Sequence, residues 1–354
     1  MNPVGYDWKR KLLITGAATL ALLLAGETTL RLWDYYFRTS YRRFDIHLGM
    51  VRPVPGYQET LNGRVFRINS LGFRAAEFTK EKPPGVFRII MLGDSVTFGL
   101  PFDECHYPGV LQQLFDAEGQ GRVEVINSAL EGYDSRDVLR LLERELMGYS
   151  PDLVTVLIGW NDLIKRDPAS PAVSDFQTQL SYAMYDVYLV RFWRKVVYFY
   201  LRHALLQPTT QLSPEEEEQM RRYIPLVYKE NLQRIISTAR TGGSDVVLFT
   251  LPSLLHPDMG PEDVRKLYFP HFTYNLRKFI LLYEQFNKTI RDVGRLTGVQ
   301  VIETQEPLRG YASQRFMDTA HPDCEGHRIL GEYLHGVLSE LVHRKRSGAN
   351  VSRR

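Results

Sequence analysis

Two short groups of residues, far apart in the chain, carry the side chains that a serine-dependent acyl transfer needs. Ser95 ends the string Gly-Asp-Ser, and His321 follows Asp318 by three positions. A serine hydroxyl is a weak nucleophile until a base takes its proton, and histidine suits that task because its pKa lies near neutrality. A carboxylate beside the imidazole orients the ring and stabilises its cation. We therefore predict Ser95 as nucleophile, His321 as base and Asp318 as the acid that orients it.

Two further groups offer hydrogen-bond donors for the negative oxygen of a tetrahedral intermediate. Gly132 stands five positions after Asn127, and Asn161 lies in the string Gly-Trp-Asn-Asp that begins at Gly159. Backbone and side-chain N–H groups aimed at such an oxygen form an oxyanion hole. We predict that the backbone amides of Ser95 and Gly132 and the side-chain amide of Asn161 form it.

Each group alone has a simpler explanation. Asp94 or Ser95 could cap a helix, Gly132 could serve only its own loop, and Asn161 could be another cap. The four groups together are informative because each falls where a parallel sheet would place a site. We expect Asp94 to brace the serine turn by accepting backbone hydrogen bonds, and we expect His327 to be structural.

The segments that must position these groups alternate between apolar strands and helices. Strands are predicted at residues 87–92, 123–127, 153–158, 246–251 and 299–303. Helices are predicted at residues 107–117, 135–147, 222–240, 276–296 and 325–344. This alternation indicates an α/β fold in which helices cover both faces of a parallel five-stranded sheet. Sites in such sheets lie beyond the carboxyl ends of the strands, where three of the four groups stand.

Residues 163–222 interrupt the alternation and predict a helical insertion, because structureless loops of that length are uncommon. The stretch 181–206 interleaves aromatic side chains with arginines. A helix packed on the domain is the simpler interpretation, and an interfacial helix or a lid over the substrate is the alternative. Ser213 followed by Pro214 predicts the cap and the first position of a new helix.

The N-terminus predicts a membrane segment. Three basic residues, Lys9, Arg10 and Lys11, precede residues 12–25, which carry no charge. That length alone suits the core of a signal peptide, but the residues after it make a poor cleavage site, and the helix can continue to Trp33. We favour an uncleaved anchor over residues 1–33, with the catalytic domain outside the cytoplasm, in the periplasm or at the cell surface. Arginines beyond the segment leave its orientation open.

The rest of the chain divides into three predicted parts. Residues 34–85 are rich in proline and glycine and predict a loop-rich arm, with one short strand near 64–69 and a turn at 68–74 packed on the main domain. Residues 86–343 form the main domain with its insertion. Residues 344–354 form a basic tail.

Charge and cysteine spacing exclude several classes of function. The net charge is +3, but both ends of the chain are basic and the body is acidic, which suits a membrane surface better than nucleic acid. No cysteine or histidine spacing matches a metal site, so neither a metal nor another cofactor is predicted. Cys105 follows the nucleophile and Cys324 follows the base. A disulfide between them would join the two loops, but we favour independent thiols.

The four groups, in this order, resemble the blocks of the SGNH/GDSL hydrolase superfamily over roughly residues 86–343. The turn at residues 69–74 and the string at 95–99 are also similar to those of membrane-anchored bacterial members. The resemblance implies a three-layer α/β/α sandwich of flavodoxin-like type. The Gly-x-Ser-x-Gly elbow of the α/β-hydrolases is absent.

The resemblance also implies roles for single residues. It makes Ser95 the nucleophile, His321 the base and Asp318 its partner, and it adds Gly132 and Asn161 as oxyanion donors. The side chain between Gly and Asn of the third block varies within the superfamily. We expect Trp160, which occupies that position here, to line the substrate pocket.

The predicted function is hydrolysis of an O-acyl ester, with acetyl favoured as the acyl group, through a serine triad and an acyl-enzyme. The expected partners are an acyl-ester substrate on a glycan or lipid, and the membrane, but no nucleic acid. One alternative is a polysaccharide O-acetyltransferase with the same site, in which a sugar hydroxyl replaces water. The others are a lipid-active enzyme with residues 181–206 as its lid, and a non-catalytic glycan-binding protein on the same fold.

Overall fold

The computed structural model describes residues 7–37, 40–61, 63–99, 105–119, 122–165, 180, 184, 187–196 and 207–346. The chain divides into two compact units. The first comprises Met1–Arg52 and Ala172–Gln207, and the second comprises Pro53–Pro171 and Pro208–Arg354. The predicted arm of residues 34–85 is therefore shared between the units, and the predicted insertion contributes a segment to the first.

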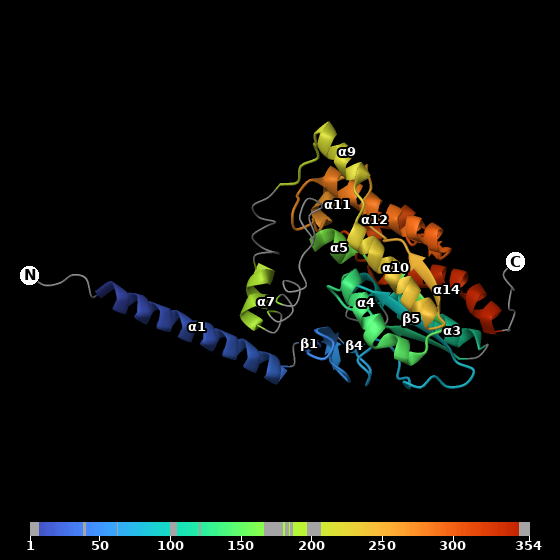
Figure 1. Ribbon diagram of the computed structural model, residues 1–354, viewed down its shortest axis with the longest axis horizontal. Coiled ribbons are helices and arrows are strands. Elements are labelled where there is room, and N and C mark those ends of the chain that lie inside the picture. Colours follow the sequence, from blue (N-terminus) through green and yellow to red (C-terminus); the bar gives the residue numbers. More distant parts are fainter. Residues whose placement is uncertain are drawn as a thin grey trace, which may run out of the picture. The chain divides into compact units, whose positions relative to one another are not determined.

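The first unit contains α1 (Asp7–Phe37), a single uninterrupted helix (Figure 1). Within the described ranges it is the one helix long and apolar enough to cross a membrane, over Trp8–Tyr36. Its apolar side chains are exposed, Leu12 to 67% and Leu22 to 74%, as lipid contact would require. Two short strands follow, β1 (Arg42–Asp45) and β2 (Met50–Pro53), which pair with each other.

Helix α7 (Tyr188–Lys195) packs on the second half of α1. The Glu27 carboxylate accepts hydrogen bonds from the backbone amides of Tyr188 (3.1 Å) and Leu189 (2.9 Å), the first two residues of α7. It thereby caps the N-terminus of α7, where a negative charge is stabilising. The Tyr188 hydroxyl donates to Asp34 at 2.5 Å. Most of the aromatic stretch 181–206 lies outside the described residues, so its role as an interfacial helix or a lid stays a prediction.

The second unit contains the predicted five-stranded sheet, and all of its strands are parallel. They stand in the order β6, β5, β7, β8, β9. Their bounds are β5 (Phe87–Gly93), β6 (Val123–Asn127), β7 (Leu153–Leu157), β8 (Asp245–Phe249) and β9 (Gln300–Ile302). Every residue of β5, β6 and β7 is buried, as expected for a parallel sheet covered on both faces.

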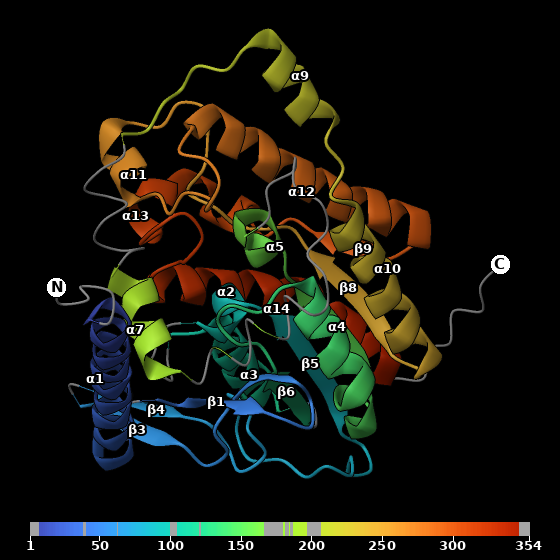
Figure 2. The ribbon, with the colours of Figure 1, turned by 60° about the vertical axis from the view of Figure 1, so that its left-hand side comes forward.

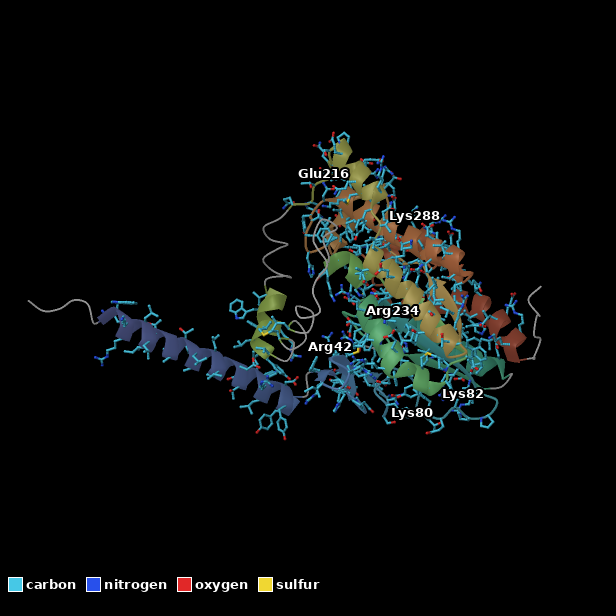
Figure 3. The ribbon with its side chains drawn as sticks, viewed as in Figure 1. Arg42, Lys80, Lys82, Glu216, Arg234 and Lys288 are labelled. Carbon is cyan, nitrogen blue, oxygen red and sulfur yellow. A yellow bond between two sulfur atoms is a disulfide. The ribbon has the colours of Figure 1, made fainter. Side chains whose placement is uncertain are left out.

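Helices cover both sides of the sheet, which confirms the three-layer α/β/α architecture (Figure 2). On one face α3 (Tyr107–Glu118) packs against α14 (Cys324–Arg346). The other face carries α4 (Ser135–Arg144), α10 (Leu226–Thr241) and α12 (Leu276–Thr297). Charged side chains such as Arg234 on α10 and Lys288 on α12 are exposed on the outer side of this layer (Figure 3).

The remaining elements are short and lie in the connections. A hairpin of β3 (Gln58–Leu61) and β4 (Arg64–Arg67) precedes the sheet. The others are α2 (Ser95–Phe98), the 3₁₀ helix η1 (Leu146–Tyr149), α5 (Trp160–Lys165), α9 (Pro214–Arg222), α11 (Pro261–Lys266), the 3₁₀ helix η4 (Glu306–Tyr311) and α13 (Ala312–Arg315). Ser213 caps α9 as predicted, because its hydroxyl accepts from the Glu216 amide at 3.1 Å.

For two helices one predicted boundary was wrong, and the backbone conformation near that boundary explains each error. The helix expected over residues 222–240 begins at Leu226, since Pro225 cannot stand in a helix interior. The helix expected over residues 135–147 ends at Arg144 and is followed by η1, after which Ser150 adopts a left-handed φ of +52°. The strand β3 was not predicted, because residues 58–61 lack an apolar alternation.

Candidate active site

Strand β5 delivers the candidate nucleophile at its carboxyl end. Gly93 ends the strand, and Asp94 caps the one-turn helix α2, whose first residue is Ser95. The Asp94 carboxylate accepts a hydrogen bond from the Val96 amide at 3.0 Å, which confirms its predicted role as a brace. A Cβ atom at Gly93 would lie 2.9 Å from the backbone oxygen of Leu157 in β7. The same Cβ would clash with the Thr97 hydroxyl in α2, so both the neighbouring strand and the turn require glycine at this position.

The loop between α13 and α14 holds the candidate base. Asp318 accepts hydrogen bonds from the backbone amides of Ala320 (2.9 Å) and His321 (3.0 Å), which closes a tight turn. Within this turn Nδ1 of His321 lies 2.8 Å from Oδ2 of Asp318. An ionised carboxylate only accepts hydrogen bonds, so Nδ1 carries the proton and Nε2 is left to accept one.

The structure brings the serine and the histidine together across 226 positions of sequence. Nε2 of His321 lies 2.6 Å from Oγ of Ser95. Ser95, His321 and Asp318 thus form one hydrogen-bonded chain of hydroxyl, imidazole and carboxylate. In such a chain the imidazole can accept the serine proton while the carboxylate holds the ring.

Charges around the imidazole favour its protonated form. Burial lowers the pKa of His321, but the hydrogen bond and charge of Asp318 outweigh it, with Asp94 and Glu131 adding to them, so the pKa is raised. For Asp318, burial raises the pKa, and the hydrogen bonds from His321 and the backbone amides lower it more, so the pKa is lowered. A basic imidazole beside an ionised carboxylate is suited to deprotonate a hydroxyl.

The Asp94 side chain, one position before Ser95, is fully buried. Burial raises its pKa to about 6, against the stabilising amides of Val96 and Trp160 and the charge of His321. The two groups are therefore linked, because protonation of Asp94 would remove one of the charges that keep His321 basic. The carboxylates do not form a metal site: among the described residues, no three His, Cys, Asp or Glu side chains gather in a way that could hold an ion.

The candidate oxyanion donors come from the segments that follow β6 and β7. Asn161 lies in the first turn of α5, and its side-chain amide donates to the Tyr133 carbonyl at 2.9 Å. A primary amide has two N–H bonds, so this contact orients the group and leaves a second donor. Gly132 is exposed and has a φ of +85°, a conformation that favours glycine. Because β6 and β7 both flank β5, these segments open at the same sheet edge as Ser95.

Comparison with models of protein families matches residues 91–329 to the GDSL-like lipase/acylhydrolase family. The chain belongs to this family. It is therefore an ester hydrolase of the GDSL type. The matched residues begin inside β5 and end inside α14, so they include the Ser95, Asp318 and His321 side chains and all of the sheet except the first four residues of β5.

Solved structures with a similar fold include three bacterial hydrolases. A GDSL-like lipase from Bacteroides thetaiotaomicron is 14% identical, with 72% of this chain and 88% of the other covered and a TM-score of 0.42. An acetylxylan esterase from Geobacillus stearothermophilus is 16% identical, with coverage of 72% and 93% and a TM-score of 0.42. A lipase/acylhydrolase from Enterococcus faecalis is 18% identical, with coverage of 72% and 96% and a TM-score of 0.43. A search of the curated proteins found no match.

A buried polar network that the sequence analysis overlooked holds residues 159–162, the segment that contains Asn161, in place. Asp162 accepts hydrogen bonds from the hydroxyl (2.6 Å) and the backbone amide (2.8 Å) of Ser135, the first residue of α4. The side-chain amide of Asn231 donates to the same hydroxyl at 2.8 Å. This network joins α5 to α4 and α10, and it fixes the helix that carries Asn161. The sequence signal was Asp162 itself, an acid directly beside the predicted oxyanion donor.

Trp160 lies in the protein core. Its side chain is only 2% exposed and stacks on Tyr283 with ring centroids 5.6 Å apart. The indole therefore supports α5 from within the fold. The expectation that Trp160 lines the substrate pocket stays a prediction, and the burial of the ring weighs against it.

Cys105 and Cys324 form a disulfide, with their Cα atoms 4.5 Å apart. The expectation of independent thiols was wrong, because the packing of α3 against α14 brings together two cysteines that are 219 positions apart. His327 takes part in this packing as a structural residue, as predicted: its buried ring stacks on Tyr107 of α3. Burial lowers the pKa of His327 to about 3, so the ring is neutral. The disulfide thus ties the start of α3 to the helix that directly follows His321.

Loss of this disulfide should destabilise the enzyme by about 4 kcal/mol, since the bond closes a long loop in the unfolded chain. Urea unfolding of the native protein, with and without reductant, and of the Cys105→Ser/Cys324→Ser variant would measure the change. Reduced protein and variant should unfold at the same lower midpoint. Equal midpoints for all samples, or two alkylatable thiols in the unreduced protein, would contradict the bond.

Proposed function

We propose that the enzyme cleaves O-acyl esters through Ser95, which His321 activates and Asp318 orients. The observation that carries this proposal is the pair of contacts at the imidazole, 2.6 Å from Nε2 to the serine hydroxyl and 2.8 Å from Nδ1 to the carboxylate. The raised pKa of His321 supports it, because a stronger base takes the serine proton more readily.

The reaction then runs in two balanced halves. Oγ of Ser95 bonds to the ester carbon as its proton passes to Nε2 of His321, and the carbonyl electron pair moves onto the oxygen. When the carbonyl forms again, the alcohol leaves and takes the proton from Nε2, so that an acyl-serine remains. Water repeats the sequence with His321 as its base, releases the acid and restores the serine hydroxyl.

The negative oxygen of each tetrahedral intermediate is proposed to accept hydrogen bonds from the Ser95 and Gly132 amides and from Asn161. Asn161→Ala should therefore lower kcat by about 10²–10³-fold, because an oxyanion donor acts on the transition state rather than on the bound substrate. KM and the thermal unfolding midpoint should change little. Steady-state kinetics with a soluble ester would test this, with Asn161→Gln as the control that keeps the amide but displaces it. A loss below tenfold, or a rise in KM at constant kcat, would contradict the role.

The proposed chemistry can be tested by labelling with a fluorophosphonate, which reacts with activated serines. We expect stoichiometric modification of one residue, and peptide mapping should place it at Ser95. A folded protein that does not react at any pH would favour the non-catalytic alternative. Acetylated sugars, lysophospholipids and acyl thioesters then test the substrate class, with acetyl esters as the proposed best substrates. Release of free acid in the presence of a glycan acceptor supports hydrolysis, whereas acetylated acceptor would identify an O-acetyltransferase.

We also propose that α1 anchors the enzyme in the membrane, uncleaved, with the catalytic unit on the extracytoplasmic side. The exposed apolar surface of α1 supports the anchor, and the Cys105–Cys324 disulfide supports an oxidising compartment. The full chain should stay with membranes after a carbonate wash. In sealed vesicles of known orientation, a protease on the extracytoplasmic side should degrade the catalytic unit, and protection there would overturn the proposed topology.

A further inference from the structure

The turn at residues 69–74 lies outside the residues that match the GDSL family, yet it is part of the core. Asn69 and Phe73 are 4% and 2% exposed, and Arg74 is 2% exposed. Asn69 closes the turn, because its side-chain oxygen accepts hydrogen bonds from the backbone amides of Leu71 (3.1 Å) and Phe73 (2.9 Å). Its side-chain amide donates to the Ala76 carbonyl at 3.1 Å. These three hydrogen bonds fix the backbone of the turn, and they therefore fix the position from which the Arg74 side chain extends.

Arg74 reaches the far end of the nucleophile helix. Its Nη1 donates to the backbone oxygen of Phe98 at 2.6 Å, and Phe98 is the last residue of α2. The guanidinium also lies against two aromatic rings, 5.1 Å from the centroid of Phe98 and 5.2 Å from that of Phe66 in β4. The two rings meet edge to face at 6.0 Å. Arg74 thus binds the carbonyl and the side chain of the same helix-end residue.

This contact matters because α2 is only one turn long. The last carbonyls of a helix have no partner within it, and so short a helix has no further turns to hold its direction. In this protein two side chains from outside α2 supply the partners. Arg74 binds the Phe98 oxygen, and the Asn127 amide at the end of β6 binds the Thr97 oxygen at 2.9 Å. At the other end of the same turn stands Ser95, whose hydroxyl must stay within reach of His321.

We infer that Arg74 is a positioning residue for the nucleophile, one that holds the C-terminal end of α2 so that Oγ of Ser95 keeps its alignment with Nε2 of His321. The inference rests on the proposed role of Ser95. It assigns a catalytic consequence to the turn at 69–74, which precedes the family match. Arg74 acts through Phe98, the last residue of α2, whose carbonyl oxygen and ring it contacts.

Two variants separate the hydrogen bond from the packing. Arg74→Met keeps an unbranched side chain beside the two rings but removes the donor and the charge, whereas Arg74→Lys keeps a donor without the planar fork. Arg67→Met, on the exposed side of β4, is the matched control. We expect Arg74→Met to lower kcat and the rate of fluorophosphonate labelling by about tenfold to a hundredfold, with KM within threefold, as for a misplaced nucleophile. The kcat and the labelling rate of Arg74→Lys should lie between those of Arg74→Met and the native enzyme. Both quantities should be native in Arg67→Met.

The labelling rate is the deciding measurement, because it reports on the serine hydroxyl in every folded molecule. A role in stability alone would lower the unfolding midpoint and leave that rate within twofold of native, which would overturn the inference. Equal losses in both Arg74 variants would also overturn it, since packing rather than the donor would then be responsible. If Arg74→Met does not fold, the labelling rate of Arg74→Lys decides: a rate more than twofold below native supports the inference, and a rate within twofold of native overturns it. Absence of labelling in the native enzyme would instead reject the proposed function.

Discussion

Replacing Ser95 with alanine should lower kcat for ester hydrolysis by roughly 10⁴–10⁶-fold, because the acyl-enzyme can no longer form. The residual rate would come from binding and from the oxyanion donors alone. KM should change little, since alanine removes one oxygen atom and keeps the backbone amide of the turn. Initial rates with a soluble acetyl ester, together with fluorophosphonate labelling, would measure the loss.

The matched control is Ser339→Ala, a half-buried serine on α14 outside the candidate site. It should keep the native rate and the native labelling. Purified Ser95→Ala must also show the native unfolding midpoint, so that misfolding does not explain the loss. A variant that keeps more than about a tenth of the native kcat, or that is still labelled once, would show that another residue is the nucleophile.

The sheet could be predicted from the sequence because its strands are recognisable locally. The predicted bounds of β5, β6 and β7 agree with the structure to within one residue at each end. Each is a short, mainly apolar run, and a residue that favours a turn stands at its end or shortly after it: Gly93 for β5, Asn127 for β6 and Gly159 for β7. The rule that parallel sheets carry their sites at the carboxyl ends then places Ser95 and Asn161 together. Local pattern and topology were therefore sufficient to predict the strands that precede these two residues.

Contacts between distant segments could not be predicted in this way. Arg88 stands in an apolar strand, and its burial is possible because the sheet register places it opposite Glu124, with the two charges 2.7 Å apart. The Cys105–Cys324 disulfide likewise depends on how two helices pack. Single-residue patterns contain no information on register or helix packing, so these pairs appear only in the folded chain.

The polar residues around the site show the same limit. Asp162 and Arg74 were visible in the sequence as members of short motifs, but their partners were not. Asp162 depends on the start of α4, and Arg74 depends on the end of α2. The proposed reacting groups could be selected by their chemistry alone, whereas the residues that hold them in position could be recognised only from their hydrogen bonds.

Asp318→Asn should lower kcat by about 10⁴-fold at neutral pH, although it removes only a charge. An asparagine side chain can present an N–H group to Nδ1, which favours the tautomer with its proton on Nε2. In that tautomer Nε2 cannot accept the proton of Ser95, 2.6 Å away. Asp323→Asn, in the same loop, is the matched control, since Asp323 pairs with Arg315 rather than with the imidazole. It should retain most of the native activity.

The pH profile of the same variant tests the electrostatics independently of the size of the loss. A general base must be neutral, so native kcat/KM should fall as the pH drops through the pKa of His321, which Asp318 holds above the ordinary range of histidine. In Asp318→Asn the hydrogen bond and charge that raise this pKa are lost, while burial, which lowers it, remains. The acid limb of the residual activity should therefore move to lower pH, even though the rate at its plateau is far smaller. An acid limb that stays in place or moves to higher pH would mean that His321 is not the group whose protonation limits the reaction.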